Sequence, residues 1–126
     1  MLRRLFLWSE RVKEIVANGL LYDFYGELLT EHQKMIYEEA VYNDMSLAEI
    51  AESYGISRQG VHDLIRRCTK TMQKYEDKLH MIKRFEEIRK ETDALKLFAG
   101  DLQLSDVQFR KKVVRVTKRI DEVLEL

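Results

Sequence analysis

The sequence predicts an all-α protein built around a helix-turn-helix. The 126 residues contain no proline and only five glycines, which argues against a loop-rich β-sandwich or a disordered linker. Capping boxes recur in front of apolar stretches, as expected at helix starts. One segment, residues 47–66, also meets the spacing requirements of a helix-turn-helix. With 45% apolar and 35% charged residues, the chain has enough of both for one small domain with a modest core.

The chain up to residue 42 predicts two or three helices. Residues 20–29 are strongly apolar and are expected to be helical. The Asn-Gly pair at residues 18–19 signals a break or a cap, so residues 1–29 form either one helix or two. A Thr-x-x-Gln capping box at residues 30–33 starts a helix over about residues 31–42. In that helix we expect four residues to face inward: Met35, Ile36, Ala40 and Val41.

Residues 47–66 carry the helix-turn-helix, with a first helix over residues 47–54. Ala51 fits the point where the two helices cross, since a larger side chain would hold the backbones apart. Four residues later, Gly55 supplies the positive φ that the sharp turn needs. Six residues after that, Val61 can pack back on the first helix. Each helix also has a serine in the capping position: Ser46 and Ser57. An ordinary helical hairpin with a glycine turn is the alternative, but it would not need the alanine.

The second helix of the motif has no stop signal before Gly100. A helix of about 40 residues would be about 60 Å long, whereas a compact domain of this length is about 35 Å across. The helix must therefore bend without a sequence signal or project. Its apolar residues follow a heptad stripe from Val61 to Ile82, which predicts burial against a second chain or against the C-terminal helix folded back. We favour a homodimer. The residues predicted at the dimer interface are Ile65, Cys68, Met72, Leu79 and Ile82.

An apolar stripe from Phe109 to Val123 predicts a C-terminal helix, although its Val-rich centre leaves a strand as the alternative. A basic face opposes the stripe and is either solvated or a contact for RNA or another partner; it comprises Lys111, Lys112, Arg115, Lys118 and Arg119.

The predicted organisation is an N-terminal arm or first helix (1–19), a helix-turn-helix domain (20–81, with the motif at about 47–66) and a helical C-terminal extension (82–126).

In helix-turn-helix proteins the N-terminal part of the second helix enters the major groove. Glutamine can pair with adenine there and arginine with guanine, while later cations suit phosphates. The candidate nucleic-acid-binding residues are Ser57, Arg58, Gln59, His62, Arg66, Arg67 and Lys70. Asp63 in the same turn would repel phosphate, and Gly60 costs about 1 kcal/mol of helix stability relative to alanine. The motif is therefore intact as architecture and weaker as a DNA reader.

Charge is divided unevenly along the chain, although the formal net charge is zero. Residues 58–84 hold eight basic and three acidic side chains, a local charge of +5. Residues 22–54 hold eight acidic side chains against Lys34 alone, a local charge of −7. Dedicated DNA-binding proteins are usually basic overall, so this distribution weighs against a long DNA footprint.

Other chemistry finds little support in the sequence. The single Cys68 excludes an internal disulfide and any multi-cysteine metal site, and it is expected to be a buried packing thiol. His32, His62 and His80 have no ligand spacing and are expected at the surface. We find no Gly-rich phosphate loop and no nucleophile with a partner base, so we expect no enzyme, no metal and no cofactor. Apolar runs fall far short of the ~18 residues of a membrane span, and we expect a reduced, cytoplasmic protein.

Four short motifs connect residues 20–81 to a known family: DFY-x-x-LLT, SLAEIAE, SRQ-x-V and YE-x-KL. Together they resemble the YlxM family of small bacterial helix-turn-helix proteins, whose motif is similar to the DNA-binding region 4 of sigma factors. The resemblance implies a bacterial, cytosolic and dimeric protein in the signal recognition particle pathway, acting on the targeting GTPase or its RNA complex. The family typically has Ala in place of Gly60 and Tyr in place of His62, so no groove-reading role is carried over to these two positions.

Two functions follow. In the first, the chain is an accessory factor that binds the signal recognition particle GTPase or its small RNA through the helix-turn-helix face and the C-terminal basic helix. Alternatively, it is a transcription regulator that binds a DNA palindrome as a homodimer. The charge distribution favours the first, because an acidic N-terminal half suits a basic protein or ribonucleoprotein and would be repelled by a long DNA footprint.

Overall fold

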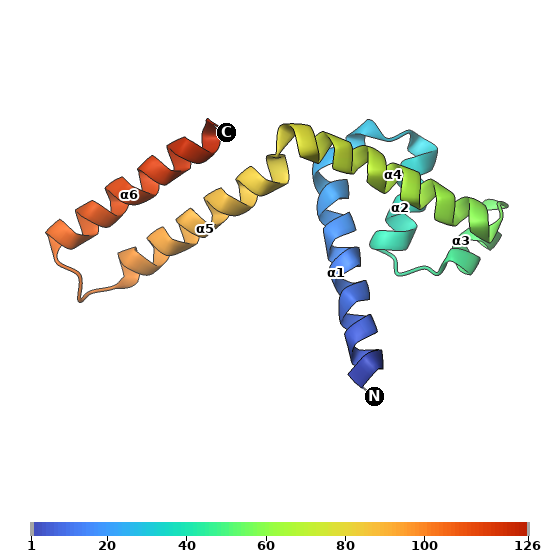
Figure 1. Ribbon diagram of the computed structural model, residues 1–126, viewed down its shortest axis with the longest axis horizontal. Coiled ribbons are helices and arrows are strands. Elements are labelled where there is room, and N and C mark those ends of the chain that lie inside the picture. Colours follow the sequence, from blue (N-terminus) through green and yellow to red (C-terminus); the bar gives the residue numbers. More distant parts are fainter. Residues whose placement is uncertain (1, 126) are drawn as a thin grey trace. The chain divides into compact units, whose positions relative to one another are not determined.

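A computed structural model describes residues 2–125, with side chains from residue 10 onward except that of residue 11. Six α-helices and one 3₁₀ turn lie within this range, and it contains no strand. The predicted all-α fold is therefore confirmed, and the Val-rich C-terminal stretch is helical. The chain divides into two compact units, Met1–Leu79 and His80–Leu126, and each is described by itself. Figure 1 shows the helices of both units.

The first helix, α1 (Leu2–Tyr25), passes through the Asn-Gly pair at residues 18–19 without a break. Of the two arrangements left open by the sequence, the single helix is therefore the one observed. A glycine inside a helix costs about 1 kcal/mol relative to alanine. Burial of Leu21 and Tyr25, both at most 5% exposed, offsets that cost in the following turns.

Gly26 ends α1 and begins the 3₁₀ turn η1 (Gly26–Leu28). A Cβ at this position would lie 2.9 Å from ring atoms of Tyr22, so the close packing of this ring requires glycine. The next helix, α2 (Glu31–Val41), starts at the predicted capping box. The backbone N–H of Gln33 donates to the hydroxyl of Thr30 at 3.2 Å. In return, the backbone N–H of Thr30 donates to Oε1 of the Gln33 side chain at 3.0 Å.

The inward face of α2 differs from the predicted one. Ile36 and Tyr37 are fully buried, whereas Met35 is 51% exposed, so its predicted inward position is wrong. Each residue advances the side chain by about 100° around a helix, so an error of one or two positions moves the buried face. Tyrosine was not expected inside, but the Tyr37 hydroxyl has a hydrogen-bond partner there, as a buried tyrosine generally requires.

The helix-turn-helix consists of α3 (Leu47–Tyr54) and α4 (Arg58–Leu79). In the first unit α4 is the central helix, because α1, α2 and α3 all pack against it. Figure 1 shows α2 and α3 along the N-terminal part of α4, with α1 crossing it nearer its C-terminal end. Its buried face is made of Val61, Leu64, Cys68 and Met72.

The sequence left two outcomes open for the segment after Arg58, a bend without a sequence signal or a projecting helix, and the structure shows a break at His80. This residue has φ 54° and ψ 31°, a left-handed conformation, and α5 (Met81–Gly100) begins directly after it. The left-handed region is uncommon for residues other than glycine. A histidine in the middle of a heptad pattern gives no warning of such a break, so the sequence offered no signal for it.

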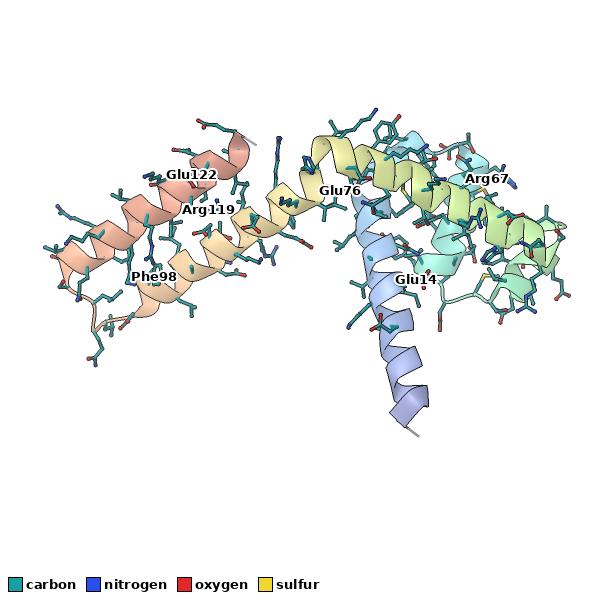
Figure 2. The ribbon with its side chains drawn as sticks, viewed as in Figure 1. Glu14, Arg67, Glu76, Phe98, Arg119 and Glu122 are labelled. Carbon is teal, nitrogen blue, oxygen red and sulfur yellow. The ribbon has the colours of Figure 1, made fainter. Side chains whose placement is uncertain are left out.

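The second unit is a helical hairpin of α5 and α6 (Asp106–Leu124), which lie side by side (Figure 2). The predicted capping box at Ser105 starts α6, with the Gln108 N–H donating to the serine hydroxyl at 3.2 Å. Val116 and Val123 of the predicted stripe are buried. Neither this unit nor the first contains, among the described residues, a helix long and apolar enough to cross a membrane.

Candidate nucleic-acid interface

The turn between α3 and α4 has the geometry that the sequence predicted. The hydroxyl of Ser46 accepts the Glu49 N–H at 3.1 Å and caps α3. Gly55 adopts φ 66° and ψ 31°, and its N–H donates to the carbonyl of Ala51. The same carbonyl accepts the Ile56 N–H at 3.1 Å, which completes a tight C-terminal cap. Ala51, the small residue predicted at the crossing of the two helices, is half-buried.

The start of α4 is held by Ser57, whose hydroxyl accepts the Gly60 N–H at 2.9 Å. Val61 is fully buried and packs on α3, as predicted. The opposite face of α4 is exposed along its whole first half. It includes every predicted nucleic-acid-binding side chain of the helix: Arg58, Gln59, His62, Arg66, Arg67 and Lys70. These residues therefore share one continuous outer surface.

Asp63 occupies the centre of the expected base-reading turn and holds several of its neighbours. The Gln59 amide nitrogen donates to the Asp63 carboxylate at 3.1 Å. Nδ1 of His62 lies 3.7 Å from the same carboxylate. The Arg67 Nε–H donates to the Asp63 backbone carbonyl at 3.4 Å. Reading a base with Gln59 would first require breaking its contact with Asp63, which weakens the direct-readout interpretation of this turn.

None of the six cations of α4 has a carboxylate partner among the described residues, and four of them follow one another at intervals of four or eight residues: Arg58, Arg66, Lys70 and Lys74. We call these four residues the α4 cation row. Their spacing of four or eight residues places each of them about one or two helical turns from the next. An unpaired row of this kind is typical of a surface that contacts phosphates, which fix position without specifying sequence.

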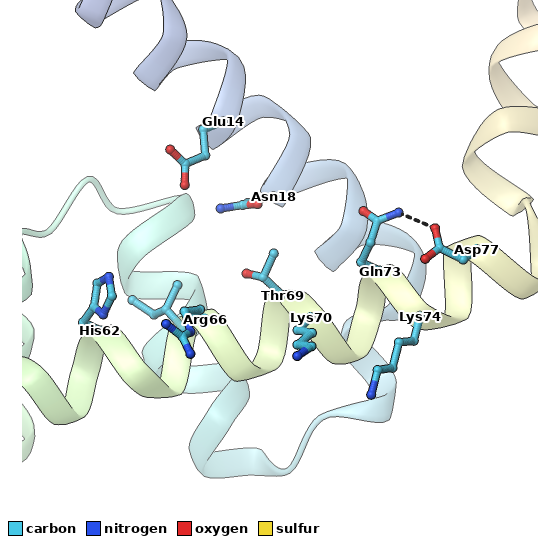
Figure 3. Close-up of a pocket in the computed structure, with 10 residues that line it drawn as sticks. Glu14, Asn18, His62, Arg66, Thr69, Lys70, Gln73, Lys74 and Asp77 are labelled. Atoms are coloured by element: carbon cyan, nitrogen blue, oxygen red, sulfur yellow. Dashed lines mark hydrogen bonds between the residues drawn. The ribbon is translucent and has the colours of Figure 1, made fainter.

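A groove of about 670 Å³ runs between α1 and the middle of α4 (Figure 3). Arg66, Lys70 and Lys74 of the cation row line it on the α4 side, together with Ile65. The α1 wall contributes polar side chains that the sequence did not single out: Glu14 and Asn18. No local motif marks them, because they reach the groove only through the packing of α1 on α4.

Tyrosines fix α4 from its buried side. The hydroxyl oxygens of Tyr37 on α2 and Thr69 on α4 lie 2.7 Å apart. The Tyr25 hydroxyl of α1 donates to the Glu76 carboxylate of α4 at 2.8 Å. Burial raises the pKa of Tyr37 above its usual value, so this hydroxyl stays neutral. No sequence motif marks these two hydroxyls, which connect α1 and α2 to α4 and hold the cation row in place.

The predicted dimer residues do not share one surface. Cys68 and Met72 are at most 1% exposed in the core of the first unit, where they pack against their own chain. The heptad stripe in this part of α4 is explained by contacts with α1 and α2, so these two side chains are not available to a partner in this fold. Burial also raises the pKa of the Cys68 thiol, as expected of a packing cysteine. Ile65 and Ile82 are half-buried, and Leu79 is 46% exposed.

A metal site finds no support in the part of the chain that the structure describes. No group of three or more His, Cys, Asp or Glu side chains is arranged there to hold an ion. The imidazoles of His32 and His62 are exposed. His32 lies edge-on to the ring of Tyr54, with ring centroids 6.4 Å apart.

The fold and the exposed face of α4 define a helix-turn-helix protein. The chain belongs to the UPF0122 family, described as "Putative helix-turn-helix protein, YlxM / p13 like", which matches residues 12–116. This match confirms the family resemblance found in the sequence and extends it into both units.

Relatives of similar length come from several bacteria. A UPF0122 protein of Thermoanaerobacter sp. (strain X514) is 39% identical over 104 residues, which cover 82% of this chain and 85% of the relative. One from Acetivibrio thermocellus is 39% identical over 116 residues, covering 89% and 97%. A third, from Caldanaerobacter subterraneus subsp. tengcongensis, is 47% identical over 77 residues, covering 61% and 66%.

Proposed function

We propose that this chain is a non-catalytic regulatory protein that acts in the cytoplasm in the signal recognition particle pathway, modulating the targeting GTPase or its RNA complex. The observation that carries the proposal is the α4 cation row, which is exposed and has no carboxylate partner among the described residues. Such a row supplies the sequence-independent part of nucleic-acid affinity. The pathway itself comes from the sequence resemblance described above.

RNA is favoured over a specific DNA site by the state of the reading turn. Gln59 is bonded to Asp63, and the carboxylate of Asp63 is half exposed on the surface that would face the phosphates. Duplex RNA has a deep and narrow major groove that side chains cannot read, so its recognition depends on shape and backbone contacts. A surface with cations and a weak reading turn fits that mode of binding better than it fits base readout.

The test is a binding titration of the full chain against signal recognition particle RNA, an unrelated RNA hairpin of equal length and random duplex DNA. We expect the tightest binding to the first RNA and a change in GTPase rate when the protein is added to the reconstituted particle. The double variant Arg66→Ala, Lys70→Ala should lose both effects. Equal binding to all three nucleic acids, together with an unchanged GTPase rate, would contradict the proposal.

A sequence-specific transcription regulator is the second candidate, favoured by the well-formed turn between α3 and α4. It would bind a palindrome as a homodimer, since helix-turn-helix dimers read two half-sites one helical turn apart. We also propose a homodimer for the first function, with exposed Leu79 at the contact. Selection of bound fragments from random duplex DNA distinguishes the two functions, because only the transcription regulator enriches a palindrome.

A further inference from the structure

The C-terminal helix α6 carries a run of positive charge that contains no acid. Between Val107 and Ile120 there are six basic residues and no aspartate or glutamate. The six are Arg110, Lys111, Lys112, Arg115, Lys118 and Arg119. They belong to the second unit, which is a separate compact part of the chain from the α4 cation row.

Two of the six cations are used inside the α5–α6 hairpin. Arg119 lies 3.4 Å from the Glu87 carboxylate of α5 and 3.5 Å from that of Glu122. Nζ of Lys112 lies 4.4 Å from the centre of the Phe98 ring. Figure 2 shows Phe98, Arg119 and Glu122 along this hairpin. Arg115 also borders α5, where it lines a cleft with Glu91 and Phe98, but it remains exposed.

The remaining four are exposed and have no carboxylate partner among the described residues; we call them the outer cations of α6, and they are Arg110, Lys111, Arg115 and Lys118. Some other exposed lysines are paired within the same helix, as with Lys90 and Glu87 of α5 at 3.7 Å. The outer cations therefore differ from an ordinary mixed surface, in which charges of both signs alternate.

The outer cations also repel one another. Lys111 and Arg115 are four residues apart, and Arg115 and Lys118 are three apart, so both pairs are neighbours on the helix surface. Like charges at these spacings destabilise a helix. A negatively charged partner lying along this face would reduce that repulsion.

We propose that the outer cations of α6 bind a nucleic-acid phosphate backbone, as a second contact separate from the α4 cation row. The inference rests on the proposed function in that it supplies a further contact to the same class of ligand. Lys111 to Lys118 span about 10 Å of helix, and a duplex carries one charge per about 1.7 Å of its axis. A duplex therefore carries about six phosphate charges over the length of this face. Flexible cations spread along a convex helix suit such an extended polyanion.

The experiment compares the full chain with the triple variant Lys111→Ala, Arg115→Ala, Lys118→Ala, using a random 20-base-pair DNA duplex as the probe. Each phosphate contact contributes about 0.9 to the slope of log affinity against log salt. Affinity falls when salt is raised from 50 to 200 mM. For a variant that has lost three contacts, this fall should be about 40-fold smaller than for the parent chain. The matched control Arg89→Ala, Lys90→Ala, Lys96→Ala removes the same charge from α5 and should leave the slope unchanged.

Thermal melting of the free proteins supplies the second readout. Because the outer cations repel one another, their triple variant should melt no lower than the parent chain. A lower melting temperature would assign these side chains a structural role and overturn the inference. An unchanged salt slope would overturn it as well, and would leave an acidic protein as the partner of this face.

A third variant separates this inference from the proposed function. Arg66→Ala, Lys70→Ala, Lys74→Ala removes three members of the α4 cation row and is predicted to reduce the slope independently. If only this α4 variant reduces it, the α6 contact is wrong and the proposed function stands. If only the α6 variant does, the α4 surface is wrong as the nucleic-acid contact and the α6 contact stands.

Discussion

The hydroxyls of Tyr37 and Thr69, 32 residues apart in the chain, lie 2.7 Å from each other where α2 crosses α4. This hydrogen bond satisfies the polar end of a fully buried tyrosine. It also fixes the middle of the helix whose opposite face carries the cation row.

Tyr37→Phe should lower the free energy of unfolding by about 1 kcal/mol, because it removes the hydrogen bond and leaves the Thr69 hydroxyl without it. Urea denaturation followed by circular dichroism measures the change. The double variant Tyr37→Phe, Thr69→Val should lose less than the sum of the single variants. Strict additivity in that cycle would mean that the two hydroxyls do not interact.

Stability should fall in alkaline solution through Tyr42. Partial burial and a hydrogen bond to the Asp23 carboxylate raise the pKa of Tyr42 to about 12 from its usual 10.0. Below pH 10 the phenol is neutral in both the folded and the unfolded chain, so its contribution is fully present. Between about pH 10 and 12 only the unfolded chain loses the proton, so stability decreases as pH rises. The side chain is 51% exposed, so the slope should stay below the full 1.4 kcal/mol per pH unit.

Urea midpoints measured from pH 9 to 12 test this decrease. Tyr42→Phe is the control and should flatten the part of the curve that belongs to this residue. Burial and a hydrogen bond to Glu38 also raise the pKa of Tyr22, so this residue lowers stability in the same pH direction. Tyr22 is unchanged in Tyr42→Phe, so its part of the decrease remains in that variant. Identical pH profiles for the parent chain and the variant would rule out the contribution of Tyr42.

Gly55→Ala should destabilise the first unit by about 1 kcal/mol. The position has φ 66° and no atom within 4 Å of a built Cβ, so the cost comes from the left-handed backbone alone. Gly100→Ala is the matched control, since that glycine also has open space around it but no positive φ. Thermal unfolding of both variants measures the difference, and equal melting temperatures would mean that the turn carries no conformational strain.

Two aspartate substitutions separate folding from dimerisation. Met72 is fully buried, so Met72→Asp should unfold the first unit, because a buried unpaired carboxylate costs several kcal/mol. Leu79 is 46% exposed, so Leu79→Asp should leave the fold within about 0.5 kcal/mol of the parent and dissociate the proposed homodimer. Circular dichroism and sedimentation equilibrium at micromolar concentration give the two readouts. A parent chain that sediments only as a species of about 15 kDa would contradict the homodimer.

Gln59→Ala should weaken binding to duplex DNA very little, because Asp63 already holds the glutamine amide. Lys70→Ala should instead lower the salt slope by about 0.9 for every sequence tested, which is the effect of one lost phosphate contact. Salt titrations on two unrelated duplexes measure both. A loss of about 1–3 kcal/mol for Gln59→Ala on one duplex alone would restore base readout and the transcription regulator.

The sequence by itself determined the features that depend on neighbours a few residues away. Thr30, Ser46 and Ser105 were recognisable as helix caps because the groups they bond lie three residues further on. Gly55 was recognisable as the turn residue because its positive φ follows from local sterics. The exposed cations of α4 could also be named in advance, because the helical period places them opposite the buried face.

Only the tertiary structure decided which helix covers each buried face. The stripe through Cys68 and Met72 predicted a dimer seam, but α1 and α2 cover it within the same chain. The break at His80 has no residue signal, because a non-glycine left-handed conformation is stabilised by its surroundings and not by its own preference. Glu14 and Asn18 reach the groove through the crossing of α1 and α4. A periodic pattern reports that a face is buried, whereas the identity of the covering element depends on packing between residues distant in sequence.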